Sequence, residues 1–368
     1  FIFLIYLIFQ ILPMPLEFLK LFSPHKYNYL KNLNLELSFS TISLSPSNSF
    51  FQFLNYVSLI LIVLIFKMLF YSHRHEMRLC LFLSILGFIS SVAALVFYLN
   101  GNPDFYIFKN SFYRNSSTGF FINRTVFSIF LIFCLLSSLM YLKDLNSEKK
   151  EIFFLKIYVR LFIVFITIGI ITSFSRIGNF LFILVLLIYL LDEVFVSKKK
   201  DRVFRNLIFL IIIFDVVILG FYFGASDLLN RFYLLNEEFA AIPTETDGLK
   251  RFEIIKFGLN QIKNYLFFGY GSGSFETLYQ LNSSGKGSHF ANHAHSDLVQ
   301  YFGELGLIGF LLINLSYVKF FFRRQFFVLK NFILLILLII ILLFDFSLHI
   351  PIIQILFLIF FVKNLKIN

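Results

Sequence analysis

The chain has 368 residues, of which 58% are hydrophobic, 14% are charged and none is Trp. Soluble domains are about half apolar and a quarter charged, so this composition excludes an ordinary soluble domain and indicates a membrane protein. The net charge of +11 does not indicate nucleic-acid binding, because basic residues also gather at the cytoplasmic ends of membrane helices.

A membrane helix needs about 20 apolar residues, and about ten apolar runs along the chain approach that length. The first run has no basic n-region and no small-residue cleavage site, so we interpret it as part of a membrane helix rather than a signal peptide. The predicted fold is an all-α, polytopic bundle of about ten transmembrane helices. The runs lie near 1–15, 51–71, 79–99, 120–142, 153–173, 179–196, 206–223, 301–321, 327–345 and 349–363.

Basic residues follow every second run, and this alternation predicts the orientation of the helices. Because short basic connections lie in the cytoplasm, the N-terminus is expected inside. The connections near 16–50, 100–119, 174–178 and 224–300 are then expected outside. The basic residues are Arg74, Arg78, Lys143, Lys149, Lys150, Lys198, Lys199, Lys200, Arg202, Arg205, Arg323, Arg324, Lys363 and Lys366.

The 224–300 connection is too long for a simple turn, and loops of that length are usually functional or disordered. Apolar residues at helical spacing within it predict an amphipathic helix over 249–264. A second helix is expected to begin near 292–296 and to continue into the membrane. The predicted division is therefore transmembrane helices over 1–223, an extracytoplasmic loop with short helices over 224–300, and further transmembrane helices over 301–368.

Two arginines are candidates for binding an anion on the predicted outer side. Arg176 lies at the outer end of the fifth helix, and Arg251 lies near the start of the amphipathic helix. An arginine at a membrane surface most often anchors to lipid headgroups. Its planar guanidinium also clamps phosphate oxygens in pairs, as binding of a lipid pyrophosphate would require.

Three histidines, His289, His293 and His295, precede the eighth helix. Zinc binding is disfavoured, because His293 and His295 would point about 200° apart on a helix and the loop supplies no Cys. A histidine at a helix end often serves only as a hydrogen-bonding group. The alternative is a general base, because the pKa of imidazole is close to neutral.

Two further features have both a structural and a functional interpretation. The Gly269–Phe275 segment is either a plain turn or a phosphate cradle made of backbone N–H groups. Within the membrane, Arg160 and Asp215 are expected to pair between helices. An ion pathway is the alternative, but transporters place such sites at broken helices, and the apolar runs predict none.

The stretch from Asn292 to Gly309 resembles the signature of the O-antigen ligase and polymerase superfamily. In that family a His precedes a leucine-rich stretch that ends in Glu-Leu-Gly-hydrophobic-Ile-Gly. Ser296 replaces the usual Asn after the His, and Ile177 is inserted before Gly178. Four upstream elements resemble the family in the same order, namely Gly119–Arg124, Ser175-Arg176 with Gly178, Arg251, and Gly269-Tyr270-Gly271 with Phe275.

The resemblance implies a membrane glycosyltransferase of the bacterial inner membrane whose active site faces the periplasm. The glycan would pass from undecaprenyl pyrophosphate to an acceptor hydroxyl with inversion of configuration. His295 would be the base, and Arg176 and Arg251 would hold the pyrophosphate. No cofactor and no metal is implied. Possible supporting residues are His293, Asn292, Arg124, Gly269 and Gly271.

The acceptor stays open. It is lipid A–core in a ligase, a second lipid-linked glycan in a polymerase and a protein in a third type of relative. The expected partners are the lipid-linked donor, one of these acceptors and membrane lipid, and no nucleic acid. The alternative from a different class is a polysaccharide transporter or flippase without catalysis, in which Asp215 matters and His295 does not.

Overall fold

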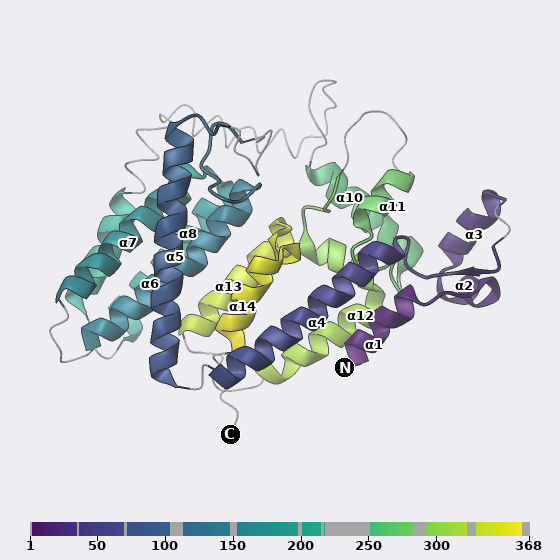
Figure 1. The fold of residues 1–368 in the computed structure, drawn as a ribbon, viewed down its shortest axis with the longest axis horizontal. Helices are drawn as coiled ribbons and strands as arrows, with labels where there is room; N and C mark the ends of the chain where they lie inside the picture. The colour runs from purple at the N-terminus through teal and green to yellow at the C-terminus, as the bar shows by residue number, and fades with distance from the viewer. Residues whose placement is uncertain are drawn as a thin grey trace. The chain divides into compact units, whose positions relative to one another are not determined.

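The computed structural model describes residues 2–34, 37–69, 72–103, 113–147, 153–197, 201–214, 217, 251–282, 291–321 and 329–362. These residues are mostly helical (Figure 1). The chain divides into two compact units, which are described separately. The first unit comprises 1–64, 232–327 and 338–351, and the second comprises 65–231, 328–337 and 352–368.

Within the described residues, six helices are long and apolar enough to cross a membrane. This confirms the predicted all-α, polytopic membrane fold. Of the predicted run at 206–223, the structure describes helix up to residue 214. The six are α4 (Pro46–Leu69), α5 (His73–Leu99), α6 (Arg124–Ser147), α7 (Phe153–Thr172), α8 (Arg176–Leu191) and α12 (Asp297–Phe321), and three shorter apolar helices are α1 (Ile2–Ile11), α13 (Leu329–Phe344) and α14 (Pro351–Val362).

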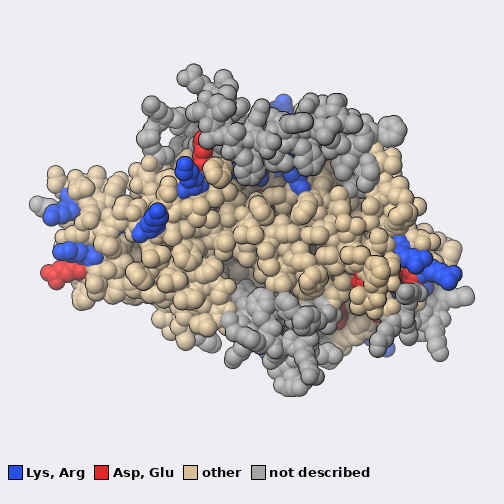
Figure 2. Space-filling view, turned by 180° about the vertical axis from the view of Figure 1, so that it is seen from behind, with Lys and Arg blue, Asp and Glu red and all other residues tan. Residues whose placement is uncertain are grey.

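Apolar side chains cover much of the outer surface of these helices. Along α4, large apolar residues from Phe50 to Leu69 are exposed, which suits contact with lipid tails. Figure 2 shows that Lys, Arg, Asp and Glu form only small scattered groups on the face that it draws. The surface therefore agrees with the composition, because a lipid-facing surface excludes charge.

The second unit is built around α6, whose apolar stretch is 94% buried. Small residues let its neighbours approach closely, as is common between membrane helices. A Cβ atom added at Gly87 of α5 would lie 2.4 Å from Cβ of Cys134, and one at Gly178 of α8 would lie 2.0 Å from Oγ of Ser128. Gly178, part of the family-like Ser-Arg element, therefore has a packing role.

Polar contacts at the two ends of the second unit agree with the predicted alternation of connections. At one end, His73 contacts Asp144 at 2.9 Å and Lys143 contacts Glu193 at 3.2 Å. At the other end, Ser117 N–H donates to the Thr172 carbonyl (2.9 Å), and the Ser175 hydroxyl donates to Thr125 Oγ1 (3.1 Å). The described ends of the basic connections thus lie together, opposite the connections predicted outside.

In the first unit, α12 is interrupted at Gly306, which has φ 65° and ψ −179°. The prediction that no helix is broken was wrong here, because a glycine inside an apolar run gives no sign of a break. The turn that follows α10 inserts at the break. Leu307 N–H donates to the Leu266 carbonyl (2.8 Å), and Gly271 N–H donates to the Glu304 carbonyl (3.1 Å).

The helix α1 completes the hydrogen bonding at this break. The Tyr6 hydroxyl donates to the Leu305 carbonyl (2.5 Å), and the Gln10 amide donates to the carbonyls of Glu304 (3.0 Å) and Phe268 (2.7 Å). An unpaired backbone group in a membrane costs several kcal/mol. The two polar side chains of an otherwise apolar helix therefore have a structural function.

The segment between α1 and α4 is folded rather than a bare connector. It contains α2 (Leu16–Phe22), α3 (Pro24–Asn32) and a short antiparallel pair of β1 (Met14–Pro15) with β2 (Phe39–Ser40). Leu44 N–H donates to the Tyr270 carbonyl (2.9 Å), and the Ser49 hydroxyl donates to the Ser272 carbonyl (2.6 Å). Two of the four connections predicted outside, 16–50 and 224–300, therefore meet at one end of the first unit.

Replacement of Gly306 is expected to cost more stability than replacement of a glycine that has only a positive φ. An alanine Cβ at 306 would lie 2.4 Å from Gly269 N and 2.5 Å from the Phe267 carbonyl oxygen. Gly101 has φ +76° and no atom within 4 Å of its Cβ position, so Gly101→Ala is the control. We expect losses of about 3–5 kcal/mol for Gly306→Ala and about 1–2 kcal/mol for Gly101→Ala, measured by SDS titration in mixed micelles. Equal losses would contradict the close contact at the break.

Cysteine labelling tests the orientation of both units. In a background with Cys80 and Cys134 replaced by Ala, Gln280→Cys and Ile122→Cys are expected to react with an impermeant maleimide in intact cells. Arg74→Cys is expected to react only after permeabilisation. All three positions are exposed, so accessibility depends on the side of the membrane. The reverse pattern would overturn the predicted orientation.

Candidate active site

The described part of the long loop is an ordered structure. The helix α10 (Arg251–Ile262) confirms the predicted amphipathic helix and continues as a short 3₁₀ turn to Tyr265. The helix α11 (Phe275–Asn282) and the segment from Ala291 share one apolar cluster with them. Gly258 allows close packing of α10 on α12, because a Cβ there would lie 2.9 Å from Cγ1 of Val299.

The Gly269–Phe275 segment uses its backbone N–H groups within the protein. Tyr270 N–H donates to the Gly303 carbonyl (3.1 Å), Ser272 N–H to Gln10 Oε1 (3.3 Å) and Gly273 N–H to Glu304 Oε2 (2.8 Å). These bonds favour the turn interpretation over a phosphate cradle. Gly269 is required by space, since its φ is +71° and a Cβ would lie 2.2 Å from the Glu304 carbonyl oxygen.

The histidine loop, residues 291–296, is held at its base by α12 and by the end of α13. Ala294 N–H donates to Gln300 Oε1 (3.0 Å), and Asp297 N–H donates to the Asp345 carbonyl (2.8 Å). His295 has φ 56°, which is uncommon for a residue other than glycine. Such backbone strain persists where the surroundings impose it, and it is concentrated at functional sites.

Aromatic contacts fix the two described histidine rings. The His293 ring stacks on Phe346 with centroids 4.7 Å apart, and the His295 ring meets the same phenyl ring edge-on at 5.3 Å. Neither Nδ1 atom has a hydrogen-bond partner. Each ring is half-buried, and its unpaired Nδ1 atom is itself buried.

Both rings are kept neutral by their surroundings. Burial and then the charge of Arg251 lower the pKa of His295 to about 4. Burial and then the charge of His349 lower the pKa of His293 to about 4. A neutral imidazole can accept a proton at physiological pH, as a general base must.

A third histidine, His349, is protonated, in contrast to the neutral rings of His293 and His295. It follows α13 in the 3₁₀ turn Ser347–His349, and its Nδ1 bonds to Asp297 Oδ1. Its Nε2 lies 3.8 Å from Glu304 Oε2. Burial alone would lower the pKa of His349, but the carboxylates of Asp297 and Glu304 outweigh burial and raise the pKa to about 10.

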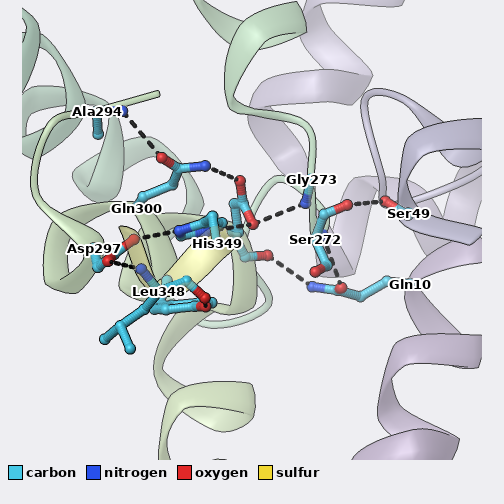
Figure 3. Close-up of polar contacts among 11 residues, drawn as sticks. Gln10, Ser49, Ser272, Gly273, Ala294, Asp297, Gln300, Leu348 and His349 are labelled. Carbon is cyan, nitrogen blue, oxygen red and sulfur yellow. Dashed lines mark hydrogen bonds and ion pairs between the residues drawn. The ribbon is translucent and has the colours of Figure 1, made fainter. Parts of the chain in front are cut away.

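Hydrogen bonds join this buried ion pair to both the histidine loop and the glycine turn (Figure 3). Leu348 N–H donates to Asp297 Oδ2 (2.8 Å), and the Gln300 amide donates to Glu304 Oε1 (2.9 Å). Glu304 also accepts from Gly273 and Gln300 accepts from Ala294, as described above. The network therefore sets the position of the loop that carries His293 and His295.

Asp297, Gln300 and Glu304 lie in the family-like stretch, but neither they nor His349 were predicted to have a role of their own. A signal was present, because the first three residues recur at spacings of three and four and so share one face of an apolar helix. Polar residues inside a membrane helix usually face the protein interior and mark functional sites. His349 had no comparable local pattern, because its partners lie about fifty positions upstream.

Of the predicted anion-binding residues, Arg251 lies in the first unit with the histidine loop. It is exposed at the first position of α10, and its charge lowers the pKa of His295. Arg124 and Arg176 belong to the second unit, for which only local surroundings are described. There the guanidinium of Arg124 lies 5.1 Å from the Tyr113 ring centroid.

Arg176 opens α8 and is exposed, and the preceding Ser175 caps that helix by accepting from Gly178 N–H at 3.1 Å. Within the family-like element, Ser175 therefore caps α8 and Gly178 allows close helix packing. Arg160 is half-buried in α7. Its predicted partner Asp215, like His289, lies outside the described residues. Among the described residues, no group of three His, Cys, Asp or Glu side chains is arranged to hold a metal ion.

Comparison with protein families gives a match to O-antigen ligase over residues 161–314. The matched segment is similar to that family. It contains Arg176, Arg251 and His295. Comparisons with curated proteins and with solved structures gave no match. The family match and the apolar helices together indicate a multi-pass membrane protein of O-antigen ligase or polymerase type.

The opposite pKa shifts predict a stability maximum near neutral pH. His349 is protonated in the folded protein up to pH about 10, so its contribution is complete below pH about 6.5 and is lost as the pH rises towards 10. His293 and His295 stay neutral in the folded protein down to pH about 4. The unfolded chain therefore binds more protons than the folded protein between pH about 6.5 and 4, and stability falls as the pH is lowered through that range.

His349→Gln tests this assignment. It leaves the carboxylates of Asp297 and Glu304 uncompensated and is expected to cost about 3–5 kcal/mol at neutral pH. Thermal unfolding in detergent is measured from pH 4 to 10 for both proteins. The variant is expected to lose the alkaline slope attributable to His349 and to keep the acid slope. An unchanged difference between pH 7 and 10 would show that His349 is not the titrating group.

Proposed function

We propose that the chain transfers a glycan from undecaprenyl pyrophosphate to a hydroxyl of lipid A–core at the periplasmic face of the bacterial inner membrane. One observation carries the proposal. A neutral, half-buried His295 with an unpaired ring nitrogen lies within the charge field of Arg251, inside the segment that matches the family. This arrangement supplies a proton acceptor beside a cation that can hold an anionic leaving group.

The proposed reaction is a single displacement. His295 takes the proton of the acceptor hydroxyl while the hydroxyl oxygen forms a bond to the anomeric carbon. The bond from that carbon to the pyrophosphate oxygen breaks, and undecaprenyl pyrophosphate leaves with the electron pair. Because attack and departure occur on opposite faces of the sugar ring, the configuration is inverted.

The arginines are proposed to bind the pyrophosphate and to stabilise its developing charge, without a metal ion. Arg251 does so from the start of α10, and Arg176 is assigned the same role from its predicted place on the outer side. A bound pyrophosphate would offset the charge of Arg251 and so raise the pKa of His295 towards neutral, where a general base works best. Because the arginines are proposed to take the role of a metal ion, transfer is expected to persist in excess EDTA.

A polymerase would use the same residues with a second lipid-linked glycan as acceptor. In cells, loss of a ligase leaves carrier-linked polymer that is not attached to lipopolysaccharide, whereas loss of a polymerase leaves a single attached repeat. A transporter is less well supported. The break in α12 resembles transporter helices, but the carbonyls of Glu304 and Leu305 are already hydrogen-bonded by Gln10 and Tyr6.

Substitutions test the assigned roles in a transfer assay with membrane vesicles. His295→Ala is expected to lower kcat/KM by about 10²- to 10⁴-fold at neutral pH, because the proton acceptor is lost. Arg251→Ala and Arg176→Ala are expected to lower it by about 10²- to 10³-fold, because leaving-group charge is less stabilised.

Two matched controls accompany these variants. Lys256→Ala removes another exposed cation from α10, and His73→Ala removes an exposed histidine at the predicted cytoplasmic end. Both are expected to retain activity within about twofold. Full transfer by His295→Ala at neutral pH would refute the general-base role. Equal losses for Lys256→Ala and Arg251→Ala would indicate general membrane electrostatics instead of pyrophosphate binding.

A further inference from the structure

A pocket of about 260 Å³ opens beside the histidine loop in the first unit. Its walls come from the first turns of α4, the Gly273–Glu276 segment, the histidine loop, α12 and His349. Figure 3 shows Gly273, Gln300 and His349 converging from three of these elements. The residues lining it are Asn48, Phe51, Gln52, Gly273, Phe275, Glu276, Asn292, His293, Gln300 and His349.

The lining has a distinctive chemistry. Four of its ten residues are amides, namely Asn48, Gln52, Asn292 and Gln300. Gln300 is already hydrogen-bonded to Ala294 and Glu304, so the other three are the amides that a ligand would meet. An amide side chain both donates and accepts hydrogen bonds, and a hydroxyl does the same. Phe51 and Phe275 add apolar surface, which suits the C–H faces of a sugar ring.

The charges of the lining disfavour an anionic ligand. It contains no Lys or Arg and it includes the carboxylate of Glu276. The cation His349 is already matched by Asp297 and Glu304. A pyrophosphate would therefore meet no uncompensated positive charge. A lipid tail is disfavoured as well, because Asn48, Gln52 and Asn292 would lose their hydrogen bonds to water without replacement.

We propose that this pocket is a binding subsite for one uncharged sugar ring of the glycan substrate, held by Asn48 and Gln52 of α4. The inference rests on the proposed function for the kind of substrate. The volume lies just below the range of about 300–1,000 Å³ typical of drug-sized ligands, so it fits one ring and not a chain. His293 lines the pocket, and its ring and that of His295 contact the same phenyl ring of Phe346, so a ring bound here lies on the side of Phe346 opposite or adjacent to the proposed base.

The close approach of α4 to the glycine turn supports a built site rather than a chance gap. Gly273 has φ +72°, and a Cβ there would lie 2.7 Å from Cγ of Gln52. The Ser49 hydroxyl, between the two amides in sequence, donates to the Ser272 carbonyl at 2.6 Å. The first turns of α4 are thus fixed against the turn that carries Gly273.

The test uses the full-length protein in detergent and saturation-transfer NMR with a panel of methyl glycosides of neutral hexoses and N-acetylhexosamines. At least one glycoside is expected to bind with saturation, and its affinity is expected to fall by about three- to tenfold in Asn48→Ala and in Gln52→Ala. Asn55→Ala, on the same helix but outside the lining, is the control. Unchanged melting temperatures exclude misfolding.

A transfer assay then separates the two sources of the sugar. In Gln52→Ala, a higher KM for the donor with unchanged kcat indicates a ring of the lipid-linked glycan, and a higher KM for the acceptor indicates a ring of the core. The NMR result does not depend on transfer, so glycoside binding without transfer would sink only the proposed function. Absence of binding by every glycoside, equal binding by Gln52→Ala, or displacement by inorganic pyrophosphate would each overturn the subsite.

Discussion

The break in α12 at Gly306 is the constraint on which the rest of the first unit depends. A membrane offers no water to pair the freed backbone groups, so protein must supply the partners. They come from Tyr6 and Gln10 of α1 and from the turn that follows α10. The same turn positions Gly273, whose N–H donates to Glu304. Glu304 also accepts from the Gln300 amide, and Gln300 accepts from Ala294 N–H. The position of His295 is therefore linked to the break through a continuous series of hydrogen bonds.

Burial lowers the pKa of all three histidines, but their charged neighbours differ. The two carboxylates beside His349 outweigh burial, so His349 holds a proton. At His295, burial is the main cause of the lowered pKa and the charge of Arg251 adds to it, so that ring holds none. The same few residues thus combine a fixed cation that neutralises buried carboxylates with a neutral ring that is free to react. This separation of protonation states is typical of sites that carry out acid–base chemistry.

Local patterns predicted most of the helices and the ordered part of the loop, because apolar periodicity depends on near neighbours. Arg251 and His295 were found because each lies beside a predicted helix start. The break at Gly306 was missed, since nothing in the run distinguishes it from a helical glycine. His349, Gln10 and Asn48 were missed because their roles exist only through contacts with residues far away in the sequence. The predicted division into 1–223, 224–300 and 301–368 and the assigned roles of the arginines stay predictions.

The contribution of both α1 and the Ser347–His349 turn has a consequence for biogenesis. Membrane helices leave the ribosome in order, and a domain generally folds once its parts are present. The groups that fix the histidine loop are encoded at opposite extremes of the described sequence. Until α13 and the Ser347–His349 turn have been made, Asp297 and Glu304 lack the counter-ion His349. The histidine loop then also lacks the Asp345 carbonyl that accepts from Asp297 N–H. The histidine loop is therefore fixed in place only after α13 and the Ser347–His349 turn have been made, although the family-like motifs all precede them in the chain.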